Sequence, residues 1–115
     1  MTELRKAIMV VFTVATSPAD EAELNDWYDN THLSDVLKTP GFVGATRYRL
    51  SQAQPQGSNP STNKYLAIYE IEAPDIQEAL DALVAGRPNR CLSPTLAIDK
   101  TQAPVYELIT ERVTE

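Results

Sequence analysis

Three side chains capable of recognition or proton transfer lie close together in the sequence. Trp27, Tyr28 and the only histidine, His32, fall within six consecutive positions. Tyr28 and His32 are four residues apart, so both face the same side of a helix. Leu24 and Val36 share that side, which makes it the apolar side that should face a sheet. An imidazole placed there can act as a general acid or base inside an aromatic-lined pocket.

The same spacing is also typical of a structural histidine, hydrogen-bonded at the edge of a core whose aromatic residues only pack. Asp29 and Asp35 flank His32 three residues away on either side. Either carboxylate could orient the imidazole or raise its pKa. A metal site is not expected, because one histidine and one cysteine leave only carboxylates as further ligands, in no recognisable ligand spacing.

Arginines and tyrosines on the predicted strands are further candidates. Arg47 and Arg49 alternate with Tyr48, so both arginines are expected on the sheet face opposite the helices. They would form salt bridges at a dimer interface or bind a substrate carboxylate or phenolate. Tyr48, Tyr65 and Tyr69 are interpreted either as sheet packing or as hydroxyl donors in a pocket.

Other reactive groups suggest less. Arg87 and Arg90 fall in a predicted loop, either as solvated charges or as an anion-binding lid. Cys91 has no second cysteine with which to pair and is interpreted as a bystander thiol. The four glycines are scattered and form no phosphate-binding loop, so nucleotide and flavin binding have no support. No cofactor is therefore expected.

The candidate residues are positioned by alternating strands and helices. Ser17 is expected to cap the first helix, with Pro18 at its first position and Glu21 completing a capping box. Pro40-Gly41 cannot continue a helix, so it should end at about Lys38. Trp27, Tyr28 and His32 thus belong to the second half of this first helix.

Strands are predicted on both sides of this helix. A polar loop, 51–63, joins the second and third strands, and another loop covers 86–94. A second helix should begin at Pro74-Asp75 and end at Leu83 or Val84. The predicted strands are Lys6–Ala15, Phe42–Leu50, Lys64–Glu72 and Val105–Val113.

The resulting order, β-α-β-β-α-β, predicts an α+β fold of the ferredoxin-like type, an antiparallel sheet with both helices on one face. The third strand is apolar on both sides, with Tyr65 and Tyr69 on one and Leu66 and Ile68 on the other. Something must therefore cover the face without helices. We expect a second copy of the chain, which gives a homodimer through the sheet face.

Composition limits the possible partners. The 115 residues are expected to form one domain, 1–115. Sixteen acidic against ten basic residues leave a formal charge of −6, which disfavours nucleic acid. The longest apolar run, Ala7–Val14, is too short to span a membrane. A single cysteine fits a reducing compartment, so a cytoplasmic location is expected.

At this point a family resemblance becomes visible. The run Trp27-Tyr28-x-x-x-His32, followed by Pro40-Gly41-Phe42 and Arg47-Tyr48, resembles the EthD-like group of dimeric α+β barrel proteins. The third strand, Tyr65–Glu70, is also similar to that group. A common form of the motif has proline where this chain has Ser34. The resemblance implies a dimeric barrel with a small pocket in each subunit and His32 as the catalytic residue.

The resemblance does not fix the reaction. Related barrels include isomerases, polyketide cyclases, cofactor-free monooxygenases, lyases and proteins of unknown role. Our leading hypothesis is a cofactor-independent isomerase, cyclase or lyase that acts on a small apolar, aromatic or polyketide-like carbonyl compound. The alternatives are a cofactor-free monooxygenase and a non-catalytic small-molecule-binding accessory protein of a catabolic pathway. With His32 as the acid or base, the expected substrate-binding residues are Trp27, Tyr28, Tyr48, Tyr65, Tyr69 and Arg47.

Overall fold

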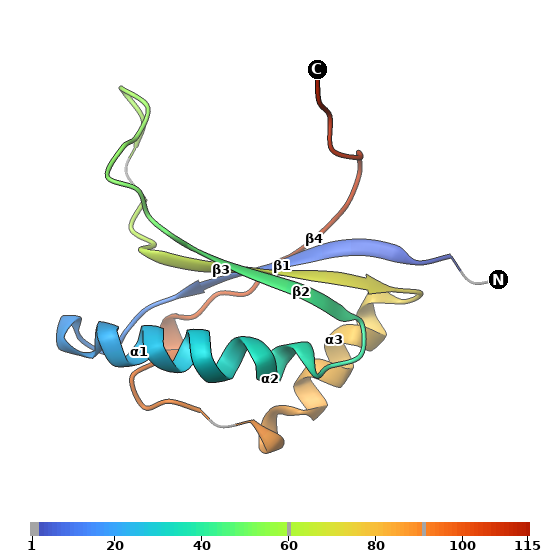
Figure 1. Cartoon of the computed structure of the whole chain (residues 1–115), viewed down its shortest axis with the longest axis horizontal. Helices are drawn as coiled ribbons and strands as arrows, with labels where there is room; N and C mark the ends of the chain where they lie inside the picture. The colour runs from blue at the N-terminus through green and yellow to red at the C-terminus, as the bar shows by residue number, and fades with distance from the viewer. Residues whose placement is uncertain (1–2, 60, 91) are drawn as a thin grey trace.

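The computed structural model describes residues 3–59, 61–90 and 92–115, and within them the chain forms a four-stranded antiparallel sheet (Figure 1). The strands lie in the order β2-β3-β1-β4. Their helices cover one face, so the predicted ferredoxin-like α+β fold is confirmed. The strands are β1 (Arg5–Thr13), β2 (Phe42–Arg49), β3 (Tyr65–Ala73) and β4 (Val105–Glu107).

Side chains alternate between two faces of the two central strands, as the period of an extended chain requires. Four apolar residues of these strands lie on the face without helices and are only partly buried: Ile8 and Val10 of β1 and Leu66 and Ile68 of β3. The central strands are therefore apolar on both sides, as predicted. The buried residues that face the helices are Ala7, Met9 and Val11 of β1 and Ala67, Tyr69 and Ile71 of β3.

The first helical segment is not one uniform helix. A 3₁₀ turn, Pro18–Asp20, leads into α1 (Glu21–Trp27), then a π-helical turn (Tyr28–His32), then α2 (Leu33–Leu37). The expected boundaries are close to these. The prediction of a single continuous helix is wrong, because the wider π turn separates α1 from α2 at Tyr28–His32.

The capping box expected at Ser17 and Glu21 is also wrong. The Ser17 hydroxyl donates to the Asp20 carboxylate at 2.8 Å rather than capping the helix. Glu21 instead pairs with Lys64 at 2.7 Å and accepts a hydrogen bond from Tyr65. These contacts attach the start of α1 to the beginning of β3.

The second helix, α3 (Ile76–Ala85), begins where the sequence predicts. The Asp75 carboxylate accepts hydrogen bonds from the backbone N–H groups of Gln77 and Glu78 and so caps the helix. Short 3₁₀ turns follow at Arg87–Asn89 and Ile98–Lys100. None of the helices in the described ranges is long and apolar enough to cross a membrane.

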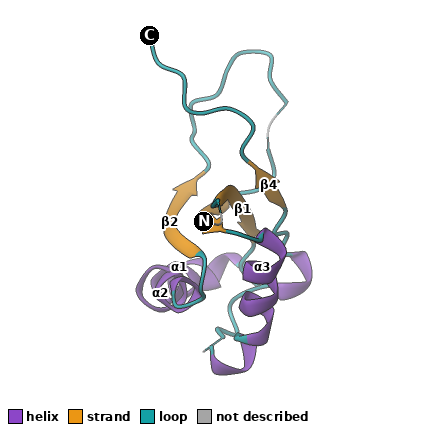
Figure 2. Cartoon of the chain, turned by 90° about the vertical axis from the view of Figure 1, so that its right-hand side faces the viewer, coloured by secondary structure: helices purple, strands orange, loops and turns teal. Residues whose placement is uncertain are grey.

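The last strand is much shorter than the predicted Val105–Val113. β4 ends at Glu107, and Leu108 N–H donates one further bond to the Lys6 carbonyl. Since β4 runs antiparallel to β1 with Glu107 opposite Ala7, Ile109 would already face Arg5, the first residue of β1. Beyond that position the described residues offer no strand with which 110–113 could pair. The segment 108–115 then leaves the sheet on the face without helices, as does the 50–64 loop (Figures 1 and 2).

Candidate functional site

The π-helical turn holds three rings against one another. The His32 ring stacks on Trp27 with centroids 4.5 Å apart and meets the Tyr28 ring edge-on at 4.8 Å. Trp27 and Tyr28 are buried and His32 is partly buried. The predicted shared face of Leu24, Tyr28, His32 and Val36 is therefore realised against the sheet. Such π turns occur often at functional sites.

His32 is an uncharged imidazole at neutral pH. Burial lowers its pKa from 6.5 to about 4, and the nearby positive charge of Arg90 adds to this, against a smaller opposing effect of Asp35. Asp35 thus acts in the direction expected of a flanking carboxylate, but burial outweighs it. Asp29 pairs with Arg47 instead. The Nδ1 atom of His32 is buried without a hydrogen-bond partner among the described residues.

Two buried tyrosines meet beside the histidine. The Tyr69 hydroxyl donates to the Tyr28 hydroxyl oxygen at 3.0 Å. Burial raises the pKa of both phenols, so both are protonated at neutral pH. Because Tyr69 is the donor in this hydrogen bond, the Tyr28 O–H remains available to donate to the oxygen of a bound molecule.

Arg47 lies on the helix face, next to these rings. Its guanidinium carbon is 4.4 Å from the Tyr28 ring centroid. Nη1 donates to Asp29 at 2.8 Å and Nη2 to Asn25 at 3.0 Å, which ties β2 to the first helical segment. We call Trp27, Tyr28, His32, Arg47 and Tyr69 the helix-face cluster.

The expected position of Arg47 on the opposite face is wrong for a specific reason. β2 carries a bulge between Phe42 and Gly44, which adds one residue on this strand relative to β3. One extra residue reverses the alternation for the rest of the strand. Arg47 and Arg49 therefore turn toward the helices, and Tyr48 turns away.

Tyr48 is the one proposed binding residue that the structure separates from His32. It lies on the face without helices and is 53% exposed. Tyr65 stays on the helix face, where its hydroxyl donates to Glu21 at 2.9 Å and its ring centroid lies 5.5 Å from the Arg47 guanidinium. Of the expected set, Tyr65 therefore borders the helix-face cluster and Tyr48 does not belong to it.

Arg90 was expected in a loop, as a solvated charge or as part of an anion-binding lid, and the fold brings its charge near His32. Sequence reasoning missed two residues that bear on the site. Asn25 carried no signal, because only the folded chain brings it near Arg47. Thr13 did carry one, since it is the polar interruption of the apolar run in β1. Its side chain is 2% exposed and its hydroxyl has no partner in the described part of the chain.

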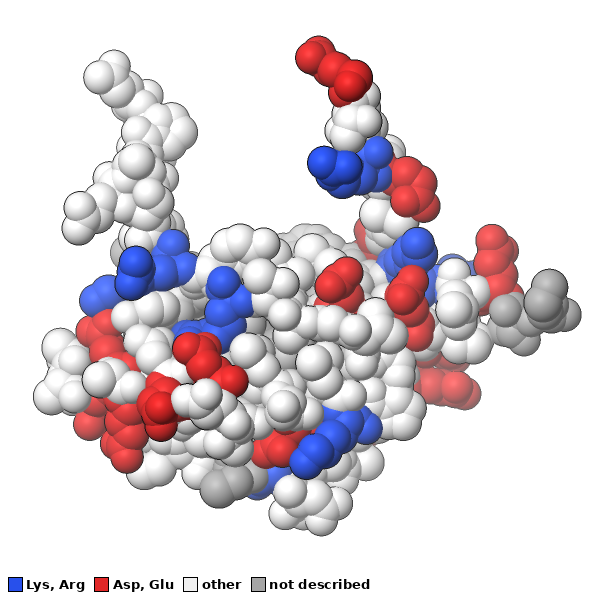
Figure 3. Space-filling view, viewed as in Figure 1, with Lys and Arg blue, Asp and Glu red and all other residues white. Residues whose placement is uncertain are grey.

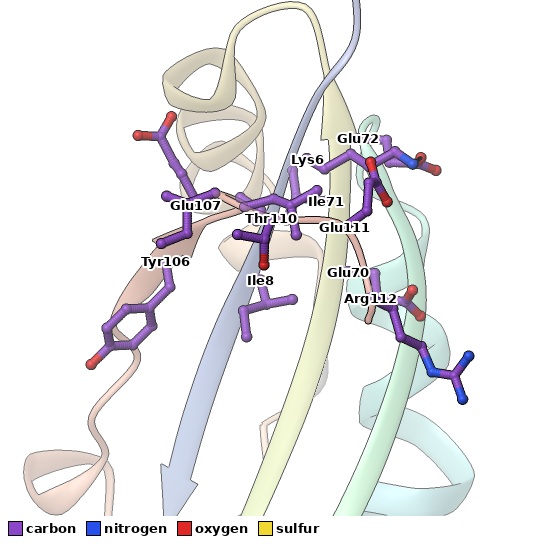
Figure 4. Close-up of a pocket in the computed structure, with 13 residues that line it drawn as sticks. Lys6, Ile8, Glu70, Ile71, Glu72, Tyr106, Glu107, Thr110, Glu111 and Arg112 are labelled. Atoms are coloured by element: carbon purple, nitrogen blue, oxygen red, sulfur yellow. Dashed lines mark ion pairs between the residues drawn. The ribbon is translucent and has the colours of Figure 1, made fainter. Parts of the chain in front are cut away.

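Hollows lie beside the cluster and across the sheet from it. One of about 220 Å³ between α2 and the 86–90 turn has Asp35 and Arg90 in its walls, the two charges that act on His32. A larger one, about 500 Å³, lies between β1, β3 and the segment after β4 on the face without helices (Figure 4). His32 lines neither of these hollows nor the three others found on the described surface, so the expected cavity beside it is not among them.

The described residues contain no group of three or more histidine, cysteine, aspartate or glutamate side chains that could hold a metal ion. Cys91 lies outside the described residues. The chemistry that can be argued from the site therefore rests on imidazole, phenol and guanidinium groups.

Comparison with known proteins identifies the fold. No protein-family model and no curated protein matches the sequence. A heme-degrading protein from Mycobacterium tuberculosis, solved free of heme, superposes with a TM-score of 0.58 at 14% identity, covering 96% of this chain and 98% of that one.

Two further solved structures also superpose on this chain. An ethyl tert-butyl ether D (EthD) family protein from Bacillus halodurans gives a TM-score of 0.55 at 19% identity, covering 91% and 99% of the two chains. A monooxygenase from Streptomyces coelicolor, in complex with nanaomycin D, gives 0.51 at 13% identity, covering 97% and 94%. An EthD family protein is among the three, so the expected resemblance in fold is confirmed.

Proposed function

We propose that this chain is a cofactor-independent enzyme that moves a proton on a small aromatic or polyketide-like carbonyl compound bound at the helix-face cluster. The observation that carries the proposal is that an uncharged, partly buried His32 meets the ring of Tyr28, whose hydroxyl can donate. A base and an oxygen-stabilising donor are the two groups that proton transfer next to a carbonyl requires.

In the proposed step His32 removes a proton from the carbon next to the substrate carbonyl. The electrons of the broken C–H bond form the enolate, whose oxygen accepts a hydrogen bond from Tyr28. Arg47 over the Tyr28 ring lowers the pKa of that hydroxyl and so makes it a better donor. Return of the proton to another carbon completes an isomerisation, and its transfer to a departing hydroxyl completes an elimination.

A pKa of about 4 makes free His32 a weak base. The enolate places negative charge beside the imidazole, and a nearby negative charge raises the pKa of an imidazolium. The complex therefore supports proton transfer better than the free protein does. Burial keeps the resting imidazole uncharged and ready to accept a proton.

A cofactor-free monooxygenase is the second candidate. One observation favours it: the fold-mate from Streptomyces coelicolor is a monooxygenase in complex with nanaomycin D. The same base would then deprotonate a phenol. The phenolate would add O₂ at a ring carbon that carries hydrogen, and loss of water from the resulting hydroperoxide would leave a quinone, so the substrate itself supplies the electrons. Oxygen consumption during turnover distinguishes this reaction from isomerisation and elimination, which consume none.

We also propose a homodimer through the face without helices, in which each copy is one domain of residues 1–115 in the cytoplasm. That face presents Ile8, Val10, Leu66 and Ile68, none of which is fully buried in the single chain. Charged side chains stand at both ends of this face. Basic side chains gather where the 50–64 loop leaves the sheet, and acidic and basic side chains are mixed where the 108–115 segment leaves it (Figure 3).

Turnover on a panel of aromatic ketones, phenols and hydroxy-lactones tests the enzymatic proposal. His32→Gln keeps volume and an amide hydrogen bond but cannot carry the proton, so the rate should fall by about 10²–10⁴-fold. Ser34→Ala, at an exposed position on the same helix, is the control and should keep its rate.

Near-native turnover by the Gln variant would exclude His32 as the base. A wild-type protein that binds members of the panel without turning any over would support the accessory-protein interpretation. Binding of heme that is lost in His32→Gln would contradict the cofactor-independent proposal.

A further inference from the structure

The largest of the hollows found among the described residues lies at the end of β2, where the 50–64 loop leaves the sheet. Its volume is about 1220 Å³. Of the five hollows it is the one that has a member of the helix-face cluster, Arg47, in its wall. We call it the basic hollow, after three of the residues that line it: Arg47, Arg49 and Lys64.

The side-chain charges in the wall of the basic hollow have one sign. The chain has sixteen acidic and ten basic residues, yet the described residues that line this hollow include three basic side chains and no acidic one. Figure 3 shows basic side chains gathered at the foot of the 50–64 loop. A hollow lined by charges of one sign attracts ions of the other sign. The basic hollow therefore favours an anion, although the whole chain has a formal charge of −6.

Two of the three positive charges are already balanced by carboxylates outside the wall. The Arg47 guanidinium lies 2.8 Å from the Asp29 carboxylate. The Lys64 ammonium lies 2.7 Å from the Glu21 carboxylate. Arg49 is exposed and forms no ion pair among the described residues. Its guanidinium is thus the charge in the hollow that is left for a ligand.

Arg49 and Lys64 both lie beside the Tyr65 ring, which also lines the hollow. Arg49 is directly opposite Tyr65 in the register of β2 and β3, so the two side chains are neighbours on one face of the sheet. Lys64 Nζ lies 5.9 Å from the Tyr65 ring centroid. The hydrogen bond to Glu21 raises the pKa of Lys64, and the charge of Arg49 opposes this, so the two cations are within electrostatic reach of each other.

We propose that the basic hollow binds the anionic end of an aromatic substrate, a carboxylate or another negatively charged oxygen group. Arg49 binds the anion, because the parallel N–H groups of its planar guanidinium match the two oxygens of a carboxylate. Lys64 adds positive charge, and the Tyr65 ring packs against the aromatic part of the substrate.

Arg47 connects the basic hollow with the helix-face cluster. It stands in the wall of the hollow, and its guanidinium carbon lies 4.4 Å from the Tyr28 ring centroid. A substrate held in the hollow therefore borders the rings beside which His32 lies. The inference rests on the proposed function for the chemistry at that end, whereas anion binding at Arg49 does not depend on it.

Binding is measured by calorimetry at neutral pH with two probes, 6-hydroxy-2-naphthoate and 2-naphthol. They share the ring system and the hydroxyl, and only the first carries a carboxylate. The net charge of −6 would by itself favour the neutral probe. We expect the reverse, with the naphthoate bound about tenfold or more tightly, which is the value of one charge-assisted hydrogen bond.

Arg49→Gln should remove most of this preference without weakening the binding of 2-naphthol. Arg5→Gln is the matched control and should keep the preference. It removes the same charge from an exposed arginine at the end of another strand, in a hollow that Asp75 and Glu107 also line. The preference of the wild-type protein should also shrink as NaCl is raised from about 0.05 to about 0.5 M, because Arg49 is exposed.

Two further measurements distinguish an aromatic substrate from other occupants of the basic hollow. Inorganic phosphate has no ring and should displace the naphthoate only at a much higher concentration than the naphthoate itself requires. Displacement at a similar concentration would overturn the selection of aromatic compounds. Arg49→Gln should keep the oligomeric state of the wild-type protein in light scattering. A change in that state would show that a second copy of the chain occupies the hollow, which would overturn the proposal.

A preference that survives in Arg49→Gln, or a wild-type protein that binds neither probe, would also overturn it. None of these measurements depends on turnover. Native turnover in His32→Gln would end the proposed function and leave anion binding in the basic hollow standing. Equal binding of the two probes would end the anion site and leave the role of His32 as proposed.

Discussion

His32 links the stability of the fold to pH in a direction that its environment determines. The folded protein holds the imidazole at a pKa of about 4, whereas an unfolded chain protonates it near 6.5. As pH falls below 6.5 the unfolded state therefore binds a proton that the folded state does not, and stability is lost until pH reaches about 4.

We expect the free energy of unfolding to fall by about 1–2 kcal/mol more in wild type than in His32→Gln between pH 7 and pH 5. Urea unfolding at the two pH values measures this difference. The Gln variant keeps every carboxylate, so it corrects for their titration. An identical pH dependence in the two proteins would contradict the burial of the imidazole as the structure gives it.

The residue scale also shows which site positions sequence reasoning can reach. Tyr28 and His32 were found because their relation depends only on helical spacing, which the π turn alters little. Arg47 was named as a candidate but placed on the wrong face, since a bulge three residues earlier reverses the alternation. Thr13 was overlooked because a lone threonine in a strand is common, and only its burial without a partner makes it unusual.

Among the elements, the π-helical turn Tyr28–His32 has the clearest functional consequence. A π turn is equivalent to one extra residue in an α-helix, so deleting one residue there lets the turn close as ordinary α-helix. Asn30 is exposed and can be removed. Because the deletion absorbs the extra residue, α2 should keep its orientation and Val36 should stay buried.

Deletion of Asn30 should therefore leave the fold intact while reducing the spacing of Tyr28 and His32 from four residues to three, which changes how their rings meet. We expect a change in the near-ultraviolet circular dichroism, a melting temperature within about 5 °C of wild type, and loss of turnover. Deletion of the exposed Glu23 in α1 is the control. It rotates all later helical residues by about 100° and should unfold the protein. Equal destabilisation by the two deletions would show that the π turn is not an insertion.

The strands show why the fold could be predicted from the sequence and why the end of the edge strand β4 could not. Period-two alternation in β1 and β3 determines which residues face the helices, and this pattern is local to each strand. The end of β4 depends instead on where β1 begins, at Arg5. The alternating pattern of 105–113 is that of a strand, but beyond Ile109 the part of the chain that the structure describes offers no neighbouring strand.

At the scale of the whole molecule, the face of the sheet without helices keeps apolar side chains only partly buried in a single chain. Its centre is apolar, the 50–64 loop and the 108–115 segment project beyond it, and the hollow of about 500 Å³ lies between that segment and the sheet (Figures 2 and 4). Ile109 and Val113 are 95% and 86% exposed on the projecting segment. Apolar side chains so placed favour contact with another protein surface.

If a second copy covers this face, light scattering at low micromolar concentration should give twice the chain mass. Covering a whole sheet face buries more than the roughly 1,600 Å² of a standard interface, which is enough for a stable dimer. Ile68→Asp places a charge in the centre of the face and should give monomers, because a buried unpaired carboxylate costs several kcal/mol. Val84→Asp, at an apolar residue of α3 that is 51% exposed, is the matched control and should remain dimeric. A wild-type monomer, or an Ile68→Asp variant that stays dimeric, would show that another surface or another partner accounts for the exposed face.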